Sequence, residues 1–414
     1  MTGLRSQRIV VTGIGVVAPN GIGKDVFWQN CFDGISGIRP ISLFDAHAYR
    51  CRCAGEVIDF TPEEHLGPKG LRTLDRTTRL ALVAAQFALK DAALEVTPAG
   101  CQDIGVVLGC TMGSVRSISE FDVESLREGP RYVNPALFPN VVINSPASHI
   151  AIRFQLRGVN STISTGFTAG LDAIGYALRL LQLRRVKAVL VGGVEELCLQ
   201  TFLGFYRLGL LATEPTGRSP RYAPFHPQRQ GTLLGEGAAI LVLEPLEEAH
   251  RRRVPAYAEL LGYGTSFHPD SAYRYDPAST ASVTASRRAL QEADVDAADI
   301  DFVSACANAT RATDAMEVVS LKTLFGDRAS RVPVSAVKSL IGESFSAGGA
   351  LQVALALGAI ARQQVPPSPA GDTNDFDLEL NLVRERARSA SVSTVLVQSI
   401  ALTGSSSALV IGGV

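Results

Sequence analysis

The chain has 414 residues, 46% of them hydrophobic and 38 of them glycine, and its 39 basic and 40 acidic residues leave a formal net charge of −1. Such a chain can form two ordinary domains or one large duplicated unit, and the composition suits a compact α/β protein with many tight turns. The balanced charge, without a long run of one sign, argues against a nucleic-acid partner.

Three further features bear on location and on bound groups. The longest apolar stretch, at about residues 348–361, is too short to span a bilayer and predicts a buried helix. The N-terminus leads directly into a predicted strand without the pattern of a secretory signal. The seven cysteines are widely spaced, and Cys51-x-Cys53 has no second pair that would indicate zinc. We therefore expect a cytoplasmic protein with reduced thiols, no metal and no cofactor.

The first half of the chain alternates predicted strands with predicted helices. Apolar, β-branched runs indicate buried strands at residues 8–15, 104–110 and 186–193. Amphipathic spacing predicts helices at residues 24–33, 73–93, 113–128 and 145–154. Residues 38–70 carry proline, aromatic and glycine punctuation and are expected to be irregular.

The segment at residues 160–183 predicts a strand that turns sharply at residues 165–167 and then becomes a helix. Apolar residues such as Ile174, Leu178 and Leu181 follow the spacing of a buried helical face. A helix N-terminus stabilises an anion, so a cysteine or serine at this elbow would be an activated nucleophile. The elbow instead carries Phe167, which can do no covalent chemistry.

The second half has the same alternation of predicted strands and helices. Strands are predicted at residues 237–244, 256–264, 301–305, 332–337, 392–400 and 407–413, and helices at residues 280–293, 312–325 and 346–362. Residues 189–194 (Val-Leu-Val-Gly-Gly-Val) and 409–414 (Leu-Val-Ile-Gly-Gly-Val) form a faint internal echo. Together with the alternation of strands and helices, the echo favours two α/β halves packed as a layered unit.

Three stretches carry a resemblance to a known family: 8–15 (Arg-Ile-Val-Val-Thr-Gly-Ile-Gly), 234–244 (Leu-Gly-Glu-Gly-Ala-Ala-Ile-Leu-Val-Leu-Glu) and 334–342 (Val-Ser-Ala-Val-Lys-Ser-Leu-Ile-Gly). With them the chain resembles the condensing enzymes, the β-ketoacyl-acyl-carrier-protein synthases of fatty-acid and type II polyketide assembly. The resemblance implies a dimer with the thiolase fold, in which duplicated halves form a five-layered αβαβα sandwich. We expect these halves at residues 1–250 and 251–414.

Active members of this family use a nucleophilic cysteine at the elbow and two histidines from the second half. The cysteine takes the acyl chain as a thioester, with backbone N–H groups as the oxyanion hole. The histidines assist decarboxylation of the malonyl extender and hold the enolate. By the resemblance, Phe167 stands at the cysteine position, Cys306 replaces the first histidine and Glu343 replaces the second.

Two further positions of the family pattern can be compared. Residues 338–343 match Lys-Ser-x-x-Gly-His up to its histidine, so Lys338 is retained. The family's C-terminal Gly-Phe-Gly-Gly loop loses its aromatic residue to Leu402.

The loss of the condensing residues does not depend on alignment. The histidines of the chain are His47, His65, His149, His226, His250 and His268. None follows residue 268, and no cysteine lies between Cys110 and Cys198. Neither family histidine can therefore exist in the second half.

Inactive copies of this kind occur as the chain-length factor, the β subunit of type II polyketide synthases. The resemblance thus implies a heterodimer with an active ketosynthase α subunit, to which the acyl-carrier protein brings the acyl or polyketide chain. Many chain-length factors carry glutamine at the nucleophile position. Phe167 departs from them, and we interpret its ring as a plug in the vestigial pocket.

Other chemistry remains open at the residues that stand at the family's catalytic positions. Cys306 is either a displaced nucleophile or a small buried thiol, and Glu343 either acts as a general base or pairs with Lys338. Thr165 and Thr168 carry hydroxyls near the elbow, where capping of the next helix is their expected task. The first alternative is an independent acyltransferase or decarboxylase using Cys306, Glu343 or Thr168, and the second is a homodimeric acyl-binding scaffold.

The resemblance also implies which residues line the acyl tunnel or the subunit interface. They are Met112, Val115, Ile118 and Phe121 on or just before one helix, Leu137 and Phe138 on the adjoining loop, and Phe205 and Leu402 near the elbow. Bulky side chains here should stop chain growth early, because overpacking a cavity is costly. The alternative for each residue is ordinary interface core.

Overall fold

The computed structural model describes residues 7–99, 101–213, 222–269, 280–369 and 380–414. Most of its strands belong to one 12-stranded sheet. The first half contributes β1 (Ile9–Ala18), β2 (Gly21–Ile22), β5 (Ile104–Gly109), β6 (Asn160–Ile163), β7 (Ala188–Glu195) and β8 (Gly237–Pro245). The second half contributes β9 (Ala258–Phe267), β10 (Phe302–Ser304), β11 (Pro333–Ser335), β13 (Asn381–Leu382), β15 (Thr394–Ile400) and β16 (Ser405–Gly412).

The two halves have the same strand order and orientation. In the first half the order is β1-β8-β7-β5-β6, and in the second it is β9-β16-β15-β10-β11. In each series the first three strands are antiparallel and the remaining neighbours are parallel. The halves join where Val10 and Val11 of β1 pair with Glu259 and Ala258 of β9. The duplication expected from the faint echo is confirmed in this topology, and the boundary at residues 250/251 remains a proposal.

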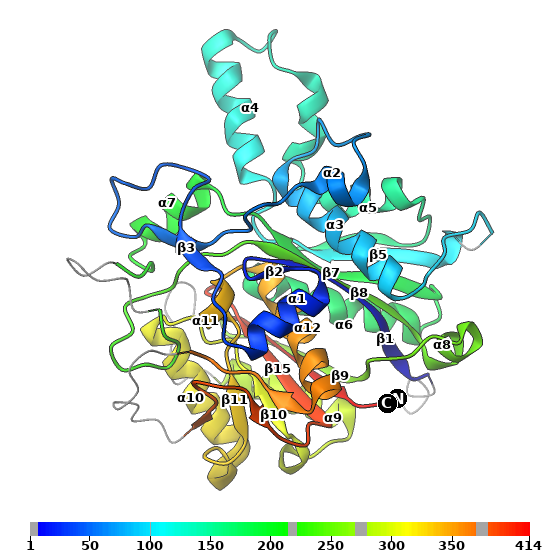
Figure 1. The fold of residues 1–414 in the computed structure, drawn as a ribbon, viewed down its shortest axis with the longest axis vertical. Helices are drawn as coiled ribbons and strands as arrows, with labels where there is room; N and C mark the ends of the chain where they lie inside the picture. The colour runs from blue at the N-terminus through cyan, green and yellow to red at the C-terminus, as the bar shows by residue number, and fades with distance from the viewer. Residues whose placement is uncertain (1–6, 100, 214–221, 270–279, 370–379) are drawn as a thin grey trace.

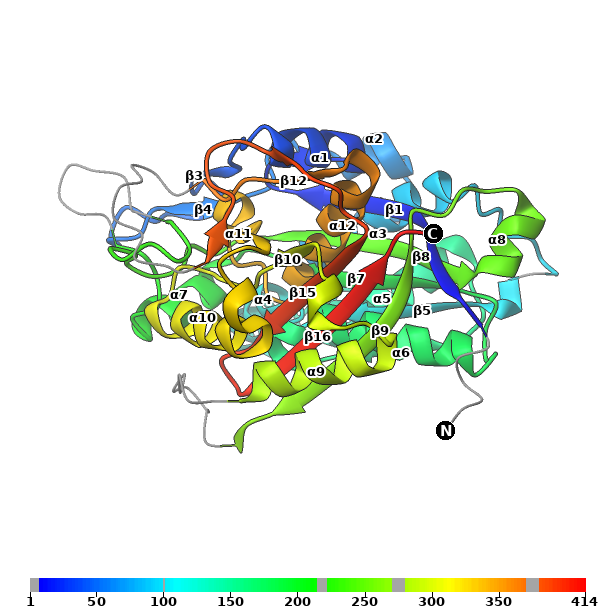
Figure 2. The same ribbon diagram turned by 90° about the horizontal axis from the view of Figure 1, so that it is seen from below.

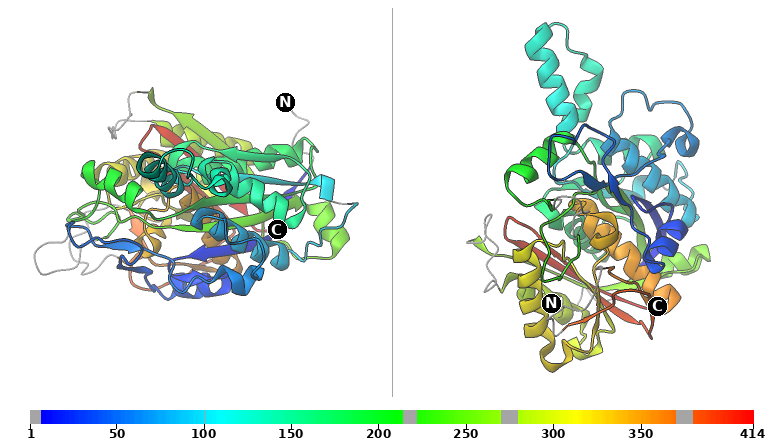
Figure 3. Two further views of the ribbon diagram at one scale, coloured as in Figure 1. Left: turned by 90° about the horizontal axis from the view of Figure 1, so that it is seen from above. Right: turned by 60° about the vertical axis from the view of Figure 1, so that its left-hand side comes forward.

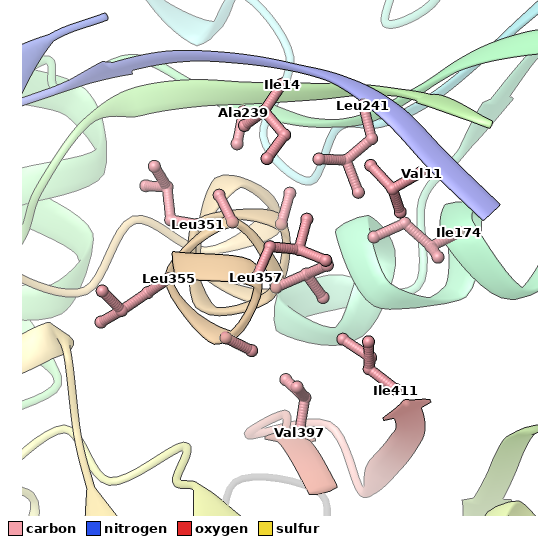
Figure 4. Packing of buried hydrophobic residues seen from close by; sticks show 14 of the residues in the cluster. Val11, Ile14, Ile174, Ala239, Leu241, Leu351, Leu355, Leu357, Val397 and Ile411 are labelled. Atoms are coloured by element: carbon pink, nitrogen blue, oxygen red, sulfur yellow. The ribbon is translucent and has the colours of Figure 1, made fainter. Parts of the chain in front are cut away.

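Two buried helices form the middle layer between the two halves of the sheet. They are α6 (Ala169–Gln182) and α12 (Ser346–Arg362), which pack against each other. Figure 4 shows Ile174 of α6 and Leu355 and Leu357 of α12 between Leu241 of β8 and Val397 of β15. Because α12 is apolar on all sides, it can be buried completely, and its residues are buried from Ser346 to Ile360.

The outer faces are covered by further helices. Against the first half lie α3 (Arg76–Asp91) and α5 (Ser145–Phe154), and against the second lie α9 (Ala281–Ala293) and α10 (Arg311–Phe325). Figure 2 shows α9 beside β9, β15 and β16. Helix, sheet, helix, sheet and helix thus form the five layers of the expected αβαβα sandwich.

Several smaller elements complete the chain. They are α1 (Lys24–Phe32), β3 (Ile38–Pro40), β4 (Cys53–Gly55), α2 (Pro62–Leu66), α7 (Leu199–Arg207), α8 (Leu246–Arg252), α11 (Lys338–Ile341), β12 (Gln364–Val365) and β14 (Arg388–Ser389). The prediction that residues 38–70 are irregular is wrong in part, because β3 pairs with β4 and α2 follows them. No helix in the described ranges is both long and apolar enough to cross a membrane.

One part of the first half stands away from the layered body. The helix α4 (Val115–Glu128) and the 3₁₀ helix η3 (Pro135–Val141) form a projecting arm, seen at the top of Figure 1 and in the right view of Figure 3. The rings of Phe121 and Phe138 lie 5.8 Å apart and connect the two sides of the arm. No residue of α4 is buried in this chain. We call residues 115–141 the arm below.

Candidate functional site

The elbow has the predicted form of a strand, a sharp turn and a helix. Strand β6 leads to the 3₁₀ helix η4 (Gly166–Thr168), and α6 begins at Ala169. Gly166 takes a φ of 76°, which a residue with a side chain rarely adopts. A Cβ atom on Gly170 would lie 2.0 Å from the carbonyl oxygen of Ser346, so the first turn of α6 touches the start of α12. This approach places Phe167 against the loop that precedes α12.

The side chain of Phe167 is buried in a cluster of three rings. Its ring centroid lies 5.0 Å from that of Phe345 and 6.0 Å from that of Phe205, and these two partners are 5.1 Å apart. Met112 and Leu402 are half-buried side chains packed against the same cluster. The elbow therefore presents a ring to other rings, at the position where the family resemblance places a nucleophile.

The predicted capping role of Thr165 and Thr168 is wrong. The structure has no side-chain cap bond at the start of α6. Thr168 Oγ1 instead donates to Asp172 Oδ2 at 2.8 Å, and Thr165 donates to the same carboxylate oxygen. Asp172 Oδ1 also accepts from Tyr263 at 2.6 Å. Both threonine hydroxyls therefore bind the Asp172 carboxylate. Because this carboxylate also binds Tyr263, it connects the elbow with the second half of the chain.

Cys306, Lys338 and Glu343 meet in one buried polar cluster. Lys338 Nζ donates to Glu343 Oε2 at 2.8 Å and to Cys306 Sγ at 3.3 Å. Each of the three residues is at most 1% exposed. The interpretation that Glu343 pairs with Lys338 is confirmed in this geometry. Because the lysine engages the carboxylate directly, Glu343 is held as an ion-pair partner and not as a free base.

Two more groups hold the Glu343 carboxylate in place. Asn308 Nδ2 donates to Oε2 at 3.0 Å, and the backbone N–H of Phe345 donates to Oε1 at 3.1 Å. Phe345 thus belongs to both neighbourhoods, because its ring touches Phe167 while its amide binds Glu343. The aromatic cluster and the polar cluster are two faces of one site.

Burial governs the protonation of the groups around Cys306. It raises the pKa of the Cys306 thiol to about 11, although nearby Lys338 acts in the opposite direction. Burial also opposes charge on Lys338, yet the neighbouring Cys306 and Glu343 outweigh it and raise the lysine pKa. Burial raises the pKa of Glu317 to about 8, although its carboxylate accepts the backbone N–H of Cys306 at 2.6 Å. At neutral pH Lys338 therefore keeps its positive charge and the Cys306 thiol keeps its proton.

The raised pKa predicts that the Cys306 thiol reacts slowly with electrophiles. A rise from 9.0 to about 11 leaves about 100-fold less thiolate at neutral pH, since each pKa unit is a factor of ten. Alkylation of Cys306 by iodoacetamide in the folded protein should be slower than that of free glutathione by at least this factor. Peptide mapping by mass spectrometry over a time course measures it. A Cys306 that reacts as fast as glutathione would support the displaced-nucleophile alternative.

The predicted tunnel residues divide into two groups. Met112, Phe205 and Leu402 lie at the aromatic cluster. The other residues lie on the arm, where Val115 and Phe121 are half-buried and Ile118, Leu137 and Phe138 are exposed. Within this chain the arm residues do not reach the elbow cluster, so their assignment to a tunnel or an interface remains a proposal.

Several residues of the site were not predicted. Phe345 contacts Phe167 and Glu343, Asn308 contacts Glu343, and Glu317 contacts Cys306. Glu195 accepts the backbone N–H groups of Thr111 and Met112 at 3.0 Å each. Asn308 and Phe345 are each two residues from a predicted position, which was the available signal. Among the described residues no group of three or more His, Cys, Asp or Glu side chains could hold a metal ion.

Comparison with known proteins gives two family matches that together cover most of the chain. The Beta-ketoacyl synthase N-terminal domain matches residues 6–249, and the Beta-ketoacyl synthase C-terminal domain matches residues 257–372. The 3-oxoacyl-[acyl-carrier-protein] synthase 2 of Coxiella burnetii is 32% identical over 412 residues, covering 99% of this chain and all of the relative. The tetracenomycin polyketide synthase ketoacyl synthase alpha subunit of Streptomyces glaucescens is 35% identical over 420 residues, covering 99% of this chain and 98% of the relative.

Solved structures agree with these matches. The ishigamide ketosynthase/chain length factor superposes with a TM-score of 0.91 at 32% identity, covering 99% of both chains. A type II polyketide synthase acyl-carrier protein complex with its hexaketide-bound ketosynthase superposes with a TM-score of 0.87 at 26% identity, covering 99% of this chain and 100% of the other. The chain therefore belongs to the β-ketoacyl synthase family and has its thiolase-like fold.

Proposed function

We propose that this chain is a non-catalytic subunit of the chain-length-factor type, which pairs with an active β-ketoacyl-acyl-carrier-protein synthase. The observation that carries the proposal is the elbow, where Phe167 is enclosed by Phe205 and Phe345 in the place of a nucleophile. The ion pair of Lys338 and Glu343 and the absence of any histidine after residue 268 point the same way.

In such a complex the chemistry belongs to the partner. The partner's cysteine holds the acyl chain as a thioester, and loss of CO2 from a malonyl extender on the carrier protein gives an enolate. Attack of this enolate on the thioester forms the new carbon–carbon bond and releases the cysteine thiol. This chain contributes surface and volume, because the walls of a shared cavity decide how long a chain fits.

The arm offers a surface for the partner. Exposed apolar side chains gather along it, among them Leu126 (86% exposed), Tyr132 (74%) and Phe138 (56%). Apolar groups exposed together on a projecting element indicate a protein interface. In addition, β6 is the last strand of the described sheet and has one open edge, where a strand of another chain can pair. The solved ishigamide ketosynthase/chain length factor supports a partner of this kind.

Co-expression tests the proposal. This chain is produced with a ketosynthase encoded beside it that retains the cysteine and both histidines, and the two are purified through a tag on one of them. We expect a stable complex with both chains in equal amounts. Failure to co-purify contradicts the proposal, and a stable homodimer of this chain alone would favour the scaffold alternative.

The tunnel assignment gives a separate prediction. In the complex, Met112→Ala or Phe138→Ala should shift the products to longer chains, because each substitution removes bulk from the space assigned to the acyl chain. Product analysis by liquid chromatography and mass spectrometry measures the shift, with Val319→Ala on α10 as the control. An unchanged product distribution for both variants removes these two residues from the tunnel.

A further inference from the structure

The loop that leads from β5 into the arm is held by a fully buried carboxyl group. Glu195, the last residue of β7, is 0% exposed. Its Oε2 accepts the backbone N–H of Thr111 and its Oε1 accepts that of Met112, at 3.0 Å each. One side chain thus fixes two adjacent backbone groups shortly before α4 begins at Val115.

The same carboxyl also reaches the start of α12. Ser346 Oγ lies 2.7 Å from Glu195 Oε2 and 2.8 Å from the carbonyl oxygen of Val194. A hydroxyl has one proton to donate and cannot serve two acceptors at once. A proton on Glu195 Oε2 resolves this, because the carboxyl then donates to Ser346 while Ser346 donates to Val194. Burial favours the same protonated form, since it raises the pKa of Glu195 to about 7.

The held loop contacts the elbow as well. Thr111 Oγ1 donates to the carbonyl oxygen of Gly166 at 2.7 Å. The side chain of Met112, which the proposed function places at the acyl tunnel, is half-buried against the cluster that contains Phe167. Gly113 follows with a φ of 64°, which a residue with a side chain rarely adopts. This short segment therefore sets the position of Met112 and of the base of the arm.

Control of chain length by Met112 requires that the loop stays in one position. The arm that follows has no buried residue in α4, and the contact of Phe121 with Phe138 joins the two sides of the arm to each other. Because Glu195 is shielded from solvent, opening its bonds leaves buried polar groups unpaired, which is costly. The carboxyl is therefore suited to hold the loop closed.

We propose that Glu195 is a positioning residue for chain length, which keeps Met112 at the acyl tunnel by binding the N–H groups of Thr111 and Met112. The inference rests on the proposed function and adds a residue that acts through Met112. When the loop is released, Met112 can move away and leave more space for the acyl chain. The products then become longer and more varied in length.

The first test measures hydrogen–deuterium exchange of the peptide that contains Thr111 and Met112, by mass spectrometry on the purified full-length chain. Glu195→Leu should speed exchange of these two amides by at least about tenfold, because both lose their acceptor. Glu195→Gln should keep exchange slow at Met112, since the amide retains an acceptor oxygen and can donate to Ser346. Because leucine and glutamine have similar volumes, the comparison separates hydrogen bonding from packing.

Glu244→Leu is the matched control for this measurement. Glu244 is 1% exposed and binds Thr12 and Arg252. It lies near the far end of β8, whereas Glu195 pairs with Gly237 at the beginning of that strand. Exchange in the loop peptide should therefore match the wild type. Unchanged exchange in Glu195→Leu, or equally fast exchange in Glu195→Gln and Glu195→Leu, overturns the proposal.

The second test measures product length in the co-purified complex by liquid chromatography and mass spectrometry. Glu195→Leu should raise the share of products longer than the main wild-type product by at least about twofold, whereas Glu244→Leu should not. Thr111→Val removes only the bond to Gly166 and should shift the products in the same direction. A wild-type distribution in Glu195→Leu, or in Thr111→Val where the first variant does not fold, overturns the proposal. Co-purification and Met112→Ala are measured alongside, so failure of the proposed function can be told apart from failure of this positioning role.

Discussion

Replacing Leu126 and Phe138 together by aspartate should weaken binding of this chain to its ketosynthase partner by at least about 100-fold. In the isolated chain these side chains are 86% and 56% exposed. Burying a large apolar side chain contributes about 1.5–3 kcal/mol, and each 1.4 kcal/mol is a factor of ten in affinity. The two losses alone reach about 3 kcal/mol, and desolvation of two carboxylates adds to them.

The measurement is the dissociation constant of the purified subunits, obtained by analytical ultracentrifugation or biolayer interferometry. The matched control places two aspartates on exposed apolar positions outside the arm, Val319 on α10 and Phe267 on β9. The control should bind within about threefold of the wild type, since surface changes away from an interface have small effects. Equal binding by the arm variant and the control would remove the arm from the interface.

Replacing Lys338 by methionine should destabilise the chain by about 3–5 kcal/mol, because removing one member of a buried ion pair leaves the other charge uncompensated. Lys338 is 1% exposed and Glu343 is fully buried. In the variant Glu343 keeps Asn308 and the amide of Phe345 as donors from the described residues. Solvent cannot replace the lost cation at this depth.

A second variant separates the ion pair from simple packing. Lys338→Met combined with Glu343→Leu removes both charges and keeps the volume, so most of the lost stability should return. Urea unfolding followed by fluorescence, with both variants and the wild type measured side by side, gives the comparison. If the double variant is as unstable as the single one, the charge balance of Lys338 and Glu343 is not what holds this cluster together.

The layered fold was predictable because its main elements have strong local patterns. The apolar run of β1 and the apolar helix α12 could be assigned from their residues alone. Strands β3 and β4 have three residues each, too few to show a period, so the segment around them was predicted to be irregular. The order of residues also showed that no histidine follows residue 268 and that no cysteine lies between Cys110 and Cys198, and the family resemblance gave these absences their meaning.

The rest of the site depends on contacts that local sequence does not show. Lys338 and Glu343 are five residues apart, so their pairing was within reach of the sequence, whereas the contact with Cys306 spans 32 residues. Capping by Thr168 was predicted wrongly, because the competing acceptor, Asp172, belongs to a hydroxyl network that includes Tyr263 from the second half.

The most direct test of the central claim is the intact mass of both subunits after reaction. The co-purified complex is incubated with acyl-carrier protein charged with an acyl chain, quenched in acid and analysed by mass spectrometry. We expect the ketosynthase partner to gain the mass of one acyl group and this chain to keep its unmodified mass. A stable acyl adduct on this chain, mapped to Cys306 or Thr168, would contradict a non-catalytic role.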